Sequence, residues 1–168
     1  PTPNEEFSLG SPVIAGEDLY VTTDRLYALK AKTGLMKWSF AATGPVSTSV
    51  AVSDDLVLVG SGPYNVRLGE GYVTAVDRKT GQARWEYSTE GEVVVPPVIA
   101  DEVVIAGTEY GNLAAIKLSD GASIWTTAHD GGVAAITAWK HLIIVSRSGR
   151  DGLTAYEIET GHEAWTFG

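Results

Sequence analysis

A block of eleven residues occurs four times in this chain and constrains its fold more than any other feature. In every copy Ala stands first, Gly seventh and Trp eleventh, and the copies span residues 28–38, 75–85, 115–125 and 155–165. The four tryptophans are 47, 40 and 40 residues apart. Self-similarity with a period of about 40 residues is typical of propellers and solenoids, and it outweighs local secondary-structure preferences.

Each unit contains four short runs with strand composition. In the first unit the runs are 12–15, 19–22, 25–31 and 35–41, separated by turn residues. A four-stranded antiparallel meander is one propeller blade. The chain is therefore predicted to be a single all-β propeller domain, 1–168, of four four-stranded antiparallel blades. The blades are expected at about 11–41, 47–88, 95–127 and 133–168. No segment has the apolar spacing of a helix.

The repeated residues suit the contact between neighbouring sheets. Ala fits where two sheets come close, Gly supplies the positive φ of a tight turn, and Trp covers the gap while its N–H bonds a carbonyl. The acid at the third position is replaced by Lys in two copies, so it is helpful rather than essential. The residues expected to hold the blades together are Ala28, Gly34, Trp38, Ala75, Asp77, Gly81, Trp85, Ala115, Gly121, Trp125, Ala155, Gly161 and Trp165.

The four-fold pattern resembles the tryptophan-docking motif of the pyrroloquinoline quinone (PQQ)-like β-propeller repeat family, from Pro12 to Gly168. That family includes quinoprotein alcohol dehydrogenases, BamB-type scaffold lipoproteins of outer-membrane protein assembly, and extracellular propellers attached to bacterial serine/threonine kinases. The resemblance implies a ring of seven or eight blades, whereas this chain provides four.

The last tryptophan, Trp165, has no following blade in the sequence. Three arrangements would resolve this. Two chains could pair into an eight-bladed ring with two-fold symmetry, the four blades could close alone, or the chain could be a piece of a longer propeller. The paired ring, a homodimer, is our expectation. Because the chain starts at Pro1 without Met, we interpret it as a cut or processed product.

Composition and motifs argue against several kinds of chemistry. A net charge of −9 disfavours nucleic acid, no apolar run is long enough to insert into a membrane, and no cysteine is present. His129, His141 and His162 lie in different types of loop, so they form no ligand set. No catalytic residue, metal site or cofactor is expected, and PQQ follows only from the family resemblance.

Binding is expected where the loops gather. In an antiparallel blade, the loop from the second to the third strand and the loop to the next blade emerge on one face. That face should carry 42–46, 61–70, 89–95, 108–111, 128–133 and 147–151, of which 61–70 is an insertion. The candidate ligand-binding residues are Tyr64, Asn65, Arg67, Glu92, Tyr110, His129, Arg147 and Arg150. Trp139, at a turn on the opposite side, is either a core residue or an exposed contact.

The chain is thus predicted to be a non-catalytic propeller module that binds a small molecule or a protein. Our first hypothesis is the extracytoplasmic sensor domain of a bacterial signalling protein such as a serine/threonine kinase, tethered to the membrane through a parent segment. The alternatives are a BamB-like scaffold and a fragment of a PQQ-dependent dehydrogenase. All three hypotheses come from the resemblance.

Overall fold

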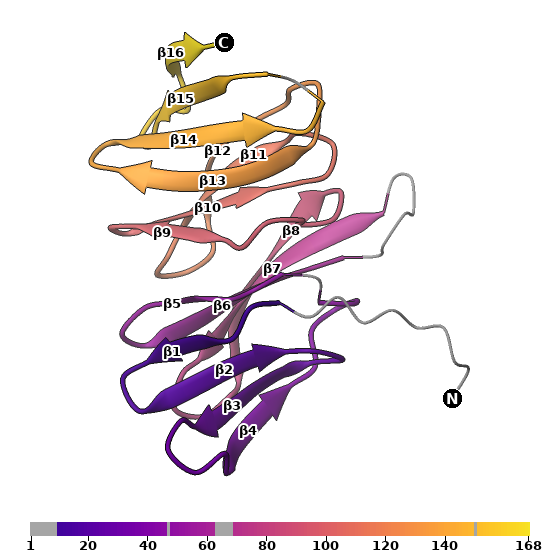
Figure 1. Cartoon of the computed structure of the whole chain (residues 1–168), viewed down its shortest axis with the longest axis vertical. Coiled ribbons are helices and arrows are strands. Elements are labelled where there is room, and N and C mark those ends of the chain that lie inside the picture. The colour runs from indigo at the N-terminus through magenta and orange to yellow at the C-terminus, as the bar shows by residue number, and fades with distance from the viewer. Residues whose placement is uncertain (1–9, 47, 63–68, 150) are drawn as a thin grey trace.

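The computed structural model (Figure 1) describes residues 10–46, 48–62, 69–149 and 151–168, and within them every regular element is a strand. The strands form four sheets of four, each pairing antiparallel in chain order. An all-β chain of four four-stranded blades, as predicted from the sequence, is confirmed. The stack of sheets does not close into a ring.

The first blade contains β1 (Val13–Ala15), β2 (Asp18–Thr22), β3 (Leu26–Lys30) and β4 (Met36–Phe40). The second contains β5 (Ala51–Val52), β6 (Leu56–Ser61), β7 (Glu70–Asp77) and β8 (Ala83–Glu90). The third contains β9 (Val98–Ala100), β10 (Val103–Gly107), β11 (Leu113–Lys117) and β12 (Ser123–Thr127). The fourth contains β13 (Val133–Trp139), β14 (Leu142–Arg147), β15 (Leu153–Glu157) and β16 (Glu163–Phe167).

The blades follow one another along the long axis of the molecule, with the first blade at one end and the fourth at the other (Figure 1). Their first strands contact one another, β5 with β9 and β9 with β13. Each blade therefore packs face to face on the next, and only the two terminal blades have a face without a neighbour among the described residues.

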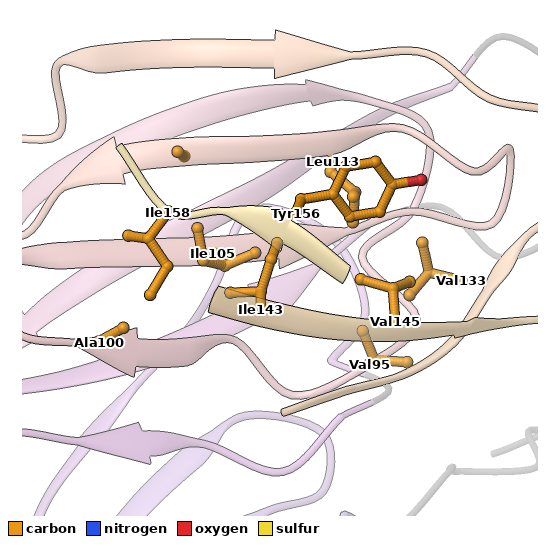
Figure 2. Packing of buried hydrophobic residues seen from close by; sticks show 10 residues of the cluster. Val95, Ala100, Ile105, Leu113, Val133, Ile143, Val145, Tyr156 and Ile158 are labelled. Atoms are coloured by element: carbon orange, nitrogen blue, oxygen red, sulfur yellow. The ribbon is translucent and has the colours of Figure 1, made fainter. Parts of the chain in front are cut away.

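The core is divided among the three seams between blades. A separate cluster of buried side chains fills each seam. Figure 2 shows the third of these, in which Ile105 and Leu113 of the third blade lie beside Ile143 and Tyr156 of the fourth. Strand alternation explains the arrangement, because successive side chains point to opposite faces and both faces of an internal blade are covered.

All four motif turns have the same backbone geometry. The motif glycines, Gly34, Gly81, Gly121 and Gly161, have φ between 70° and 77°, and each donates its N–H to the carbonyl of the third motif residue. A β-bulge follows the motif alanine in every blade. Because the third residue is Lys, Asp, Lys and Glu in turn, the turn forms without an acid.

Three motif tryptophans span the seams. The indole N–H of Trp38 donates to the carbonyl of Arg78 at 3.0 Å, and that of Trp85 to Leu118 at 3.0 Å. Trp125 donates to Ile158 at 2.7 Å. The acceptor is always the main-chain carbonyl of the fourth residue of the next blade's motif, which is Arg78, Leu118 or Ile158.

Each of these indoles also lies against the motif glycine of the next blade. A Cβ added to Gly81, Gly121 or Gly161 would come within 2.8 Å of the indole above it. The glycine is therefore needed for close approach as well as for its positive φ.

Candidate functional site

The predicted binding loops lie together on one face of the stack. Backbone bonds join the loop between the second and third strands of a blade to the loop that enters it: Gly62 N–H to Pro45 at 3.1 Å, Glu109 N–H to Glu92 at 3.1 Å, and Ser148 N–H to Gly132 at 2.7 Å. The same link thus occurs in three consecutive blades. It fixes the loops relative to one another before any ligand is present.

Half of the eight predicted binding residues can be placed. Tyr64, Asn65, Arg67 and Arg150 lie outside the described residues. Glu92 is buried and its carbonyl takes part in the loop link, so its position favours a structural role. Tyr110 is 41% exposed, and its ring lies over Gly91.

His129 and Arg147 come together around a third residue, Tyr156. The His129 and Tyr156 rings are 5.3 Å apart, and Arg147 Nη2 donates to the Tyr156 hydroxyl at 3.2 Å. Arg147 Nη1 donates to the carbonyls of Gly111 at 2.9 Å and Gly131 at 3.4 Å. Much of the hydrogen-bonding capacity of Arg147 is therefore used to hold loops from two blades.

A cleft of about 610 Å³ opens next to this group, at the fourth blade. It is lined by Ala128, His129, Asp130, Val145, Arg147, Asp151, Gly152, Leu153, Thr154, Tyr156, Glu163, Thr166, Phe167 and Gly168. The lining combines aromatic rings with side chains of both charges. Tyr156 and Phe167 are not among the predicted binding residues, because their strand positions predict core residues and nothing in the sequence marks them as reaching a cleft.

The cleft does not suit the quinone cofactor that the resemblance implies. PQQ carries three carboxylates, which require several cationic or N–H donors. Arg147 already donates to protein oxygens, and Asp130, Asp151 and Glu163 line the same cleft with like charge. In the described part of the chain, no three His, Asp or Glu side chains are placed to share a metal ion.

The opposite face carries the motif turns, and its polar network is structural. Asp77 Oδ1 accepts the N–H of Thr80 at 2.8 Å and that of Lys79 at 3.0 Å, while Oδ2 pairs with Arg84 Nη2 at 2.7 Å. The Thr80 N–H, followed by the Arg84 guanidinium, holds the pKa of the Asp77 carboxyl well below its usual range.

Arg78, which the sequence analysis did not single out, crosses the first seam. Its Nη2 donates to the carbonyl of Ala15 at 2.6 Å, its Nε to the Tyr20 hydroxyl at 3.0 Å, and its Nη1 to the carbonyl of Ser53 at 3.2 Å. Burial raises the pKa of the Tyr20 phenol, although the Arg78 bond acts in the opposite direction. The fourth motif position is Ala, Arg, Leu or Ile in the four blades, so an arginine there gives no sequence signal for this role.

Trp139 is 56% exposed, so it is not a core residue, and its role as a contact residue stays a prediction. Lys140 Nζ lies 4.5 Å from the centroid of its ring system. Among the described residues there is also no helix long and apolar enough to cross a membrane.

Comparison with known proteins agrees with this geometry. The family described as outer membrane protein assembly factor BamB matches residues 2–128 and 69–168. No curated protein sequence matches the chain.

Among solved structures, BamB from Moraxella catarrhalis is similar with a TM-score of 0.78 and 19% identity, over 93% of this chain and 47% of that one. A quinohemoprotein alcohol dehydrogenase from Pseudomonas putida HK5 is similar with a TM-score of 0.77 and 17% identity, over 94% of this chain and 33% of that one. The computationally designed Ika4 protein has a TM-score of 0.76 and 11% identity, over 93% of this chain and 94% of that one.

The chain thus spans about half the length of the BamB structure and about a third of the dehydrogenase. At these identities the similarity shows the fold, which scaffold proteins and enzymes share. Because the family match extends over nearly the whole sequence, the chain belongs to the PQQ-like propeller repeat family described as outer membrane protein assembly factor BamB.

Proposed function

We propose that the chain is a non-catalytic binding module that acts outside the cytoplasm and engages a protein partner through its loop face. The observation that carries the proposal is the link between loops in three consecutive blades. Loops held on a rigid scaffold lose little conformational entropy when a partner binds. The cleft beside them offers aromatic and charged side chains for recognition.

The family supports a protein as the partner and an extracytoplasmic location. Its description refers to an assembly factor of the outer membrane, and scaffolding is therefore the form of binding that we favour. The sensor domain of a signalling kinase stays a prediction that rests on the earlier resemblance. A kinase domain and a transmembrane helix in the same gene product would support the sensor, whereas a lipobox cysteine before Pro1 would support the scaffold.

The proposal can be tested by capturing envelope proteins from the source cells on the immobilised chain. We expect a defined partner to bind the unmodified chain and to be lost when Tyr110→Ser and Asp151→Lys alter the loop face. The matched control, Asp55→Lys, changes a turn on the opposite face and should leave capture unchanged. Equal capture by all three proteins would overturn the proposal.

The enzyme alternative is tested separately by titrating the chain with PQQ and calcium and following tryptophan fluorescence. We expect no saturable change, because the carboxylates of the cleft repel a tricarboxylate. A saturable change that is lost in Arg147→Met would restore the dehydrogenase interpretation.

A further inference from the structure

The two ends of the stack carry the two halves of one more seam. At the fourth blade, Trp165 is 40% exposed, whereas in the internal seams Trp38 and Trp85 are 9% exposed and Trp125 is half-buried. At the first blade, a Cβ on Gly34 would meet no described atom within 4 Å. The fourth motif residue there is Ala31, whose carbonyl is in the place that accepts an indole N–H in the other three blades.

The face of the fourth blade around Trp165 is apolar. Trp139 pairs with Leu142 in the fourth blade, and Ala100 pairs with Val103 at the equivalent place in the third blade. Ala100 is buried in the seam between the third and fourth blades, so it points toward the following blade. By this register Trp139 lies on the same face as Trp165. Phe167, two residues after Trp165, shares that side and is 73% exposed.

The free face of the first blade has core-like residues as well. By strand register, Leu19 and Val21 correspond to Val57 and Val59 of the second blade. The two valines are fully buried, whereas Leu19 and Val21 are only half-buried. Ile14, on the neighbouring strand, is 67% exposed. These side chains are therefore of the kind that a further blade would cover.

The two ends also differ in charge. The motif turn of the first blade exposes Lys30 and Lys32, and that of the fourth exposes Glu157 and Glu159. In an additional seam these turns would be neighbours, as the turns at Gly81 and Gly121 are within the chain. Opposite charges at that distance favour association and select the correct pairing.

We propose that a second copy of this chain fills both ends and completes an eight-bladed ring. Each Trp165 covers Gly34 of the partner subunit and donates its indole N–H to the carbonyl of Ala31 of the partner subunit. Two-fold symmetry makes two such seams at once, so no free face is left and assembly stops at two chains. One copy supplies both halves of the seam, because its two ends are the same as those of the first.

This assembly does not depend on the proposed partner, but it affects the same cleft. Leu153 and Phe167 line the cleft and also belong to the free face of the fourth blade. The first blade of a second copy would therefore form the wall of the cleft that the single chain does not provide.

The first test is sedimentation equilibrium of the unmodified chain over a wide concentration range. We expect a reversible equilibrium between one and two chains. Trp165→Ala removes the indole from both seams, so the dissociation constant should rise about a thousandfold. The matched control Ile124→Ala removes an exposed apolar side chain from an internal blade and should leave the constant unchanged.

A charge-reversal pair tests which ends meet. Lys30→Glu with Lys32→Glu gives one variant, and Glu157→Lys with Glu159→Lys gives the other. Each should self-associate about tenfold more weakly at low salt, because every seam then joins like charges. An equimolar mixture places opposite charges at both seams, so the mixture should form one-to-one dimers with the original affinity.

Three results would overturn the proposal: a strict monomer at every concentration, assemblies that grow beyond two chains, or a dimer that Trp165→Ala leaves intact. Circular dichroism and thermal unfolding of each variant show whether it is folded, so misfolding is not mistaken for lost association. The capture experiment on the loop face has a separate readout. Either conclusion can therefore fail without the other.

Discussion

Trp125 and Trp165 occupy the same motif position in adjacent blades, yet their surroundings differ. Trp125 lies on Gly161, donates to the carbonyl of Ile158 at 2.7 Å and is half-buried, whereas Trp165 is 40% exposed. The motif alone therefore does not bury its tryptophan. Burial comes from the glycine and the carbonyl of the following blade, so the smallest complete unit of this fold is the seam between two blades.

The largest expected effect comes from removing an internal indole. Trp85→Ala should lower the free energy of unfolding by about 3–5 kcal/mol, because it leaves a cavity in the seam and an unpaired Leu118 carbonyl. Urea denaturation measures this. Trp165→Ala is the matched variant at the free end, and below the concentration of any self-association it should cost less than about 1 kcal/mol. Equal losses would contradict the distinction between the two kinds of site.

Substitution of the motif glycine tests the same difference between an internal seam and a free end, because this glycine is the residue that the indole of the preceding blade covers. Gly121→Ala places a Cβ 2.8 Å from Trp85 Cδ2 at a φ of +77°, so we expect a loss of about 2–3 kcal/mol. Gly34→Ala has nearly the same φ, +70°, with open space around it in the single chain, and below the concentration of any self-association it should cost about 1 kcal/mol. The difference between the two unfolding energies isolates the contact with the indole from the backbone strain. No difference would mean that the indole moves aside freely.

Arg78→Met should have a smaller effect, about 1–2 kcal/mol, because it removes the bonds to the Ala15 carbonyl and the Tyr20 hydroxyl but keeps most of the aliphatic contact. Thermal unfolding measures the loss. The same substitution should alter the phenol titration of Tyr20, seen by ultraviolet absorbance, since the arginine acts to lower its pKa. Lys79→Met, at the next and exposed position of the turn, serves as the control.

The smallest expected effect is a pH dependence from the turn at Asp77. Since folding lowers the pKa of this carboxyl, its contribution is fully present above the ordinary pKa and is lost as the pH falls toward the folded value. Asp77→Asn should therefore lower the melting temperature at neutral pH. The melting temperature of this variant should also fall less than that of the unmodified chain when the pH is lowered. Thr80→Val removes one hydrogen-bond donor to Asp77, so its melting temperature at neutral pH should lie between those of Asp77→Asn and the unmodified chain. Parallel acid-unfolding curves for Asp77→Asn and the unmodified chain would refute this.

The sequence was sufficient to predict the blades, because the strands and turns of each blade are determined by residues that are close to one another in the chain. In the first blade, the observed strands differ from the predicted runs by no more than one residue at either end. The predicted meeting of loops on one face likewise follows from antiparallel topology. Neither prediction required any knowledge of which side chains touch.

The details of the candidate site could not be predicted in the same way. Arg147 was predicted from the sequence to be a loop residue available for binding. In the structure it holds Gly111, in a loop of the third blade, and Gly131, in the loop between the third and fourth blades. Tyr156 reads as a core strand residue, yet its hydroxyl and ring join Arg147 and His129 at the cleft. These contacts connect residues from neighbouring repeats, and the repeat pattern specifies which blades are adjacent but not how their loops pack.

The acceptor of every seam indole is a main-chain carbonyl, and the residues that carry it are Arg78, Leu118 and Ile158. Since this hydrogen bond uses no particular side chain on the accepting residue, a duplicated, deleted or transplanted blade that keeps the motif would still offer an acceptor to the indole of its neighbour. A change of ring size by whole blades during evolution would therefore need no matching mutation at the acceptor of the indole bond.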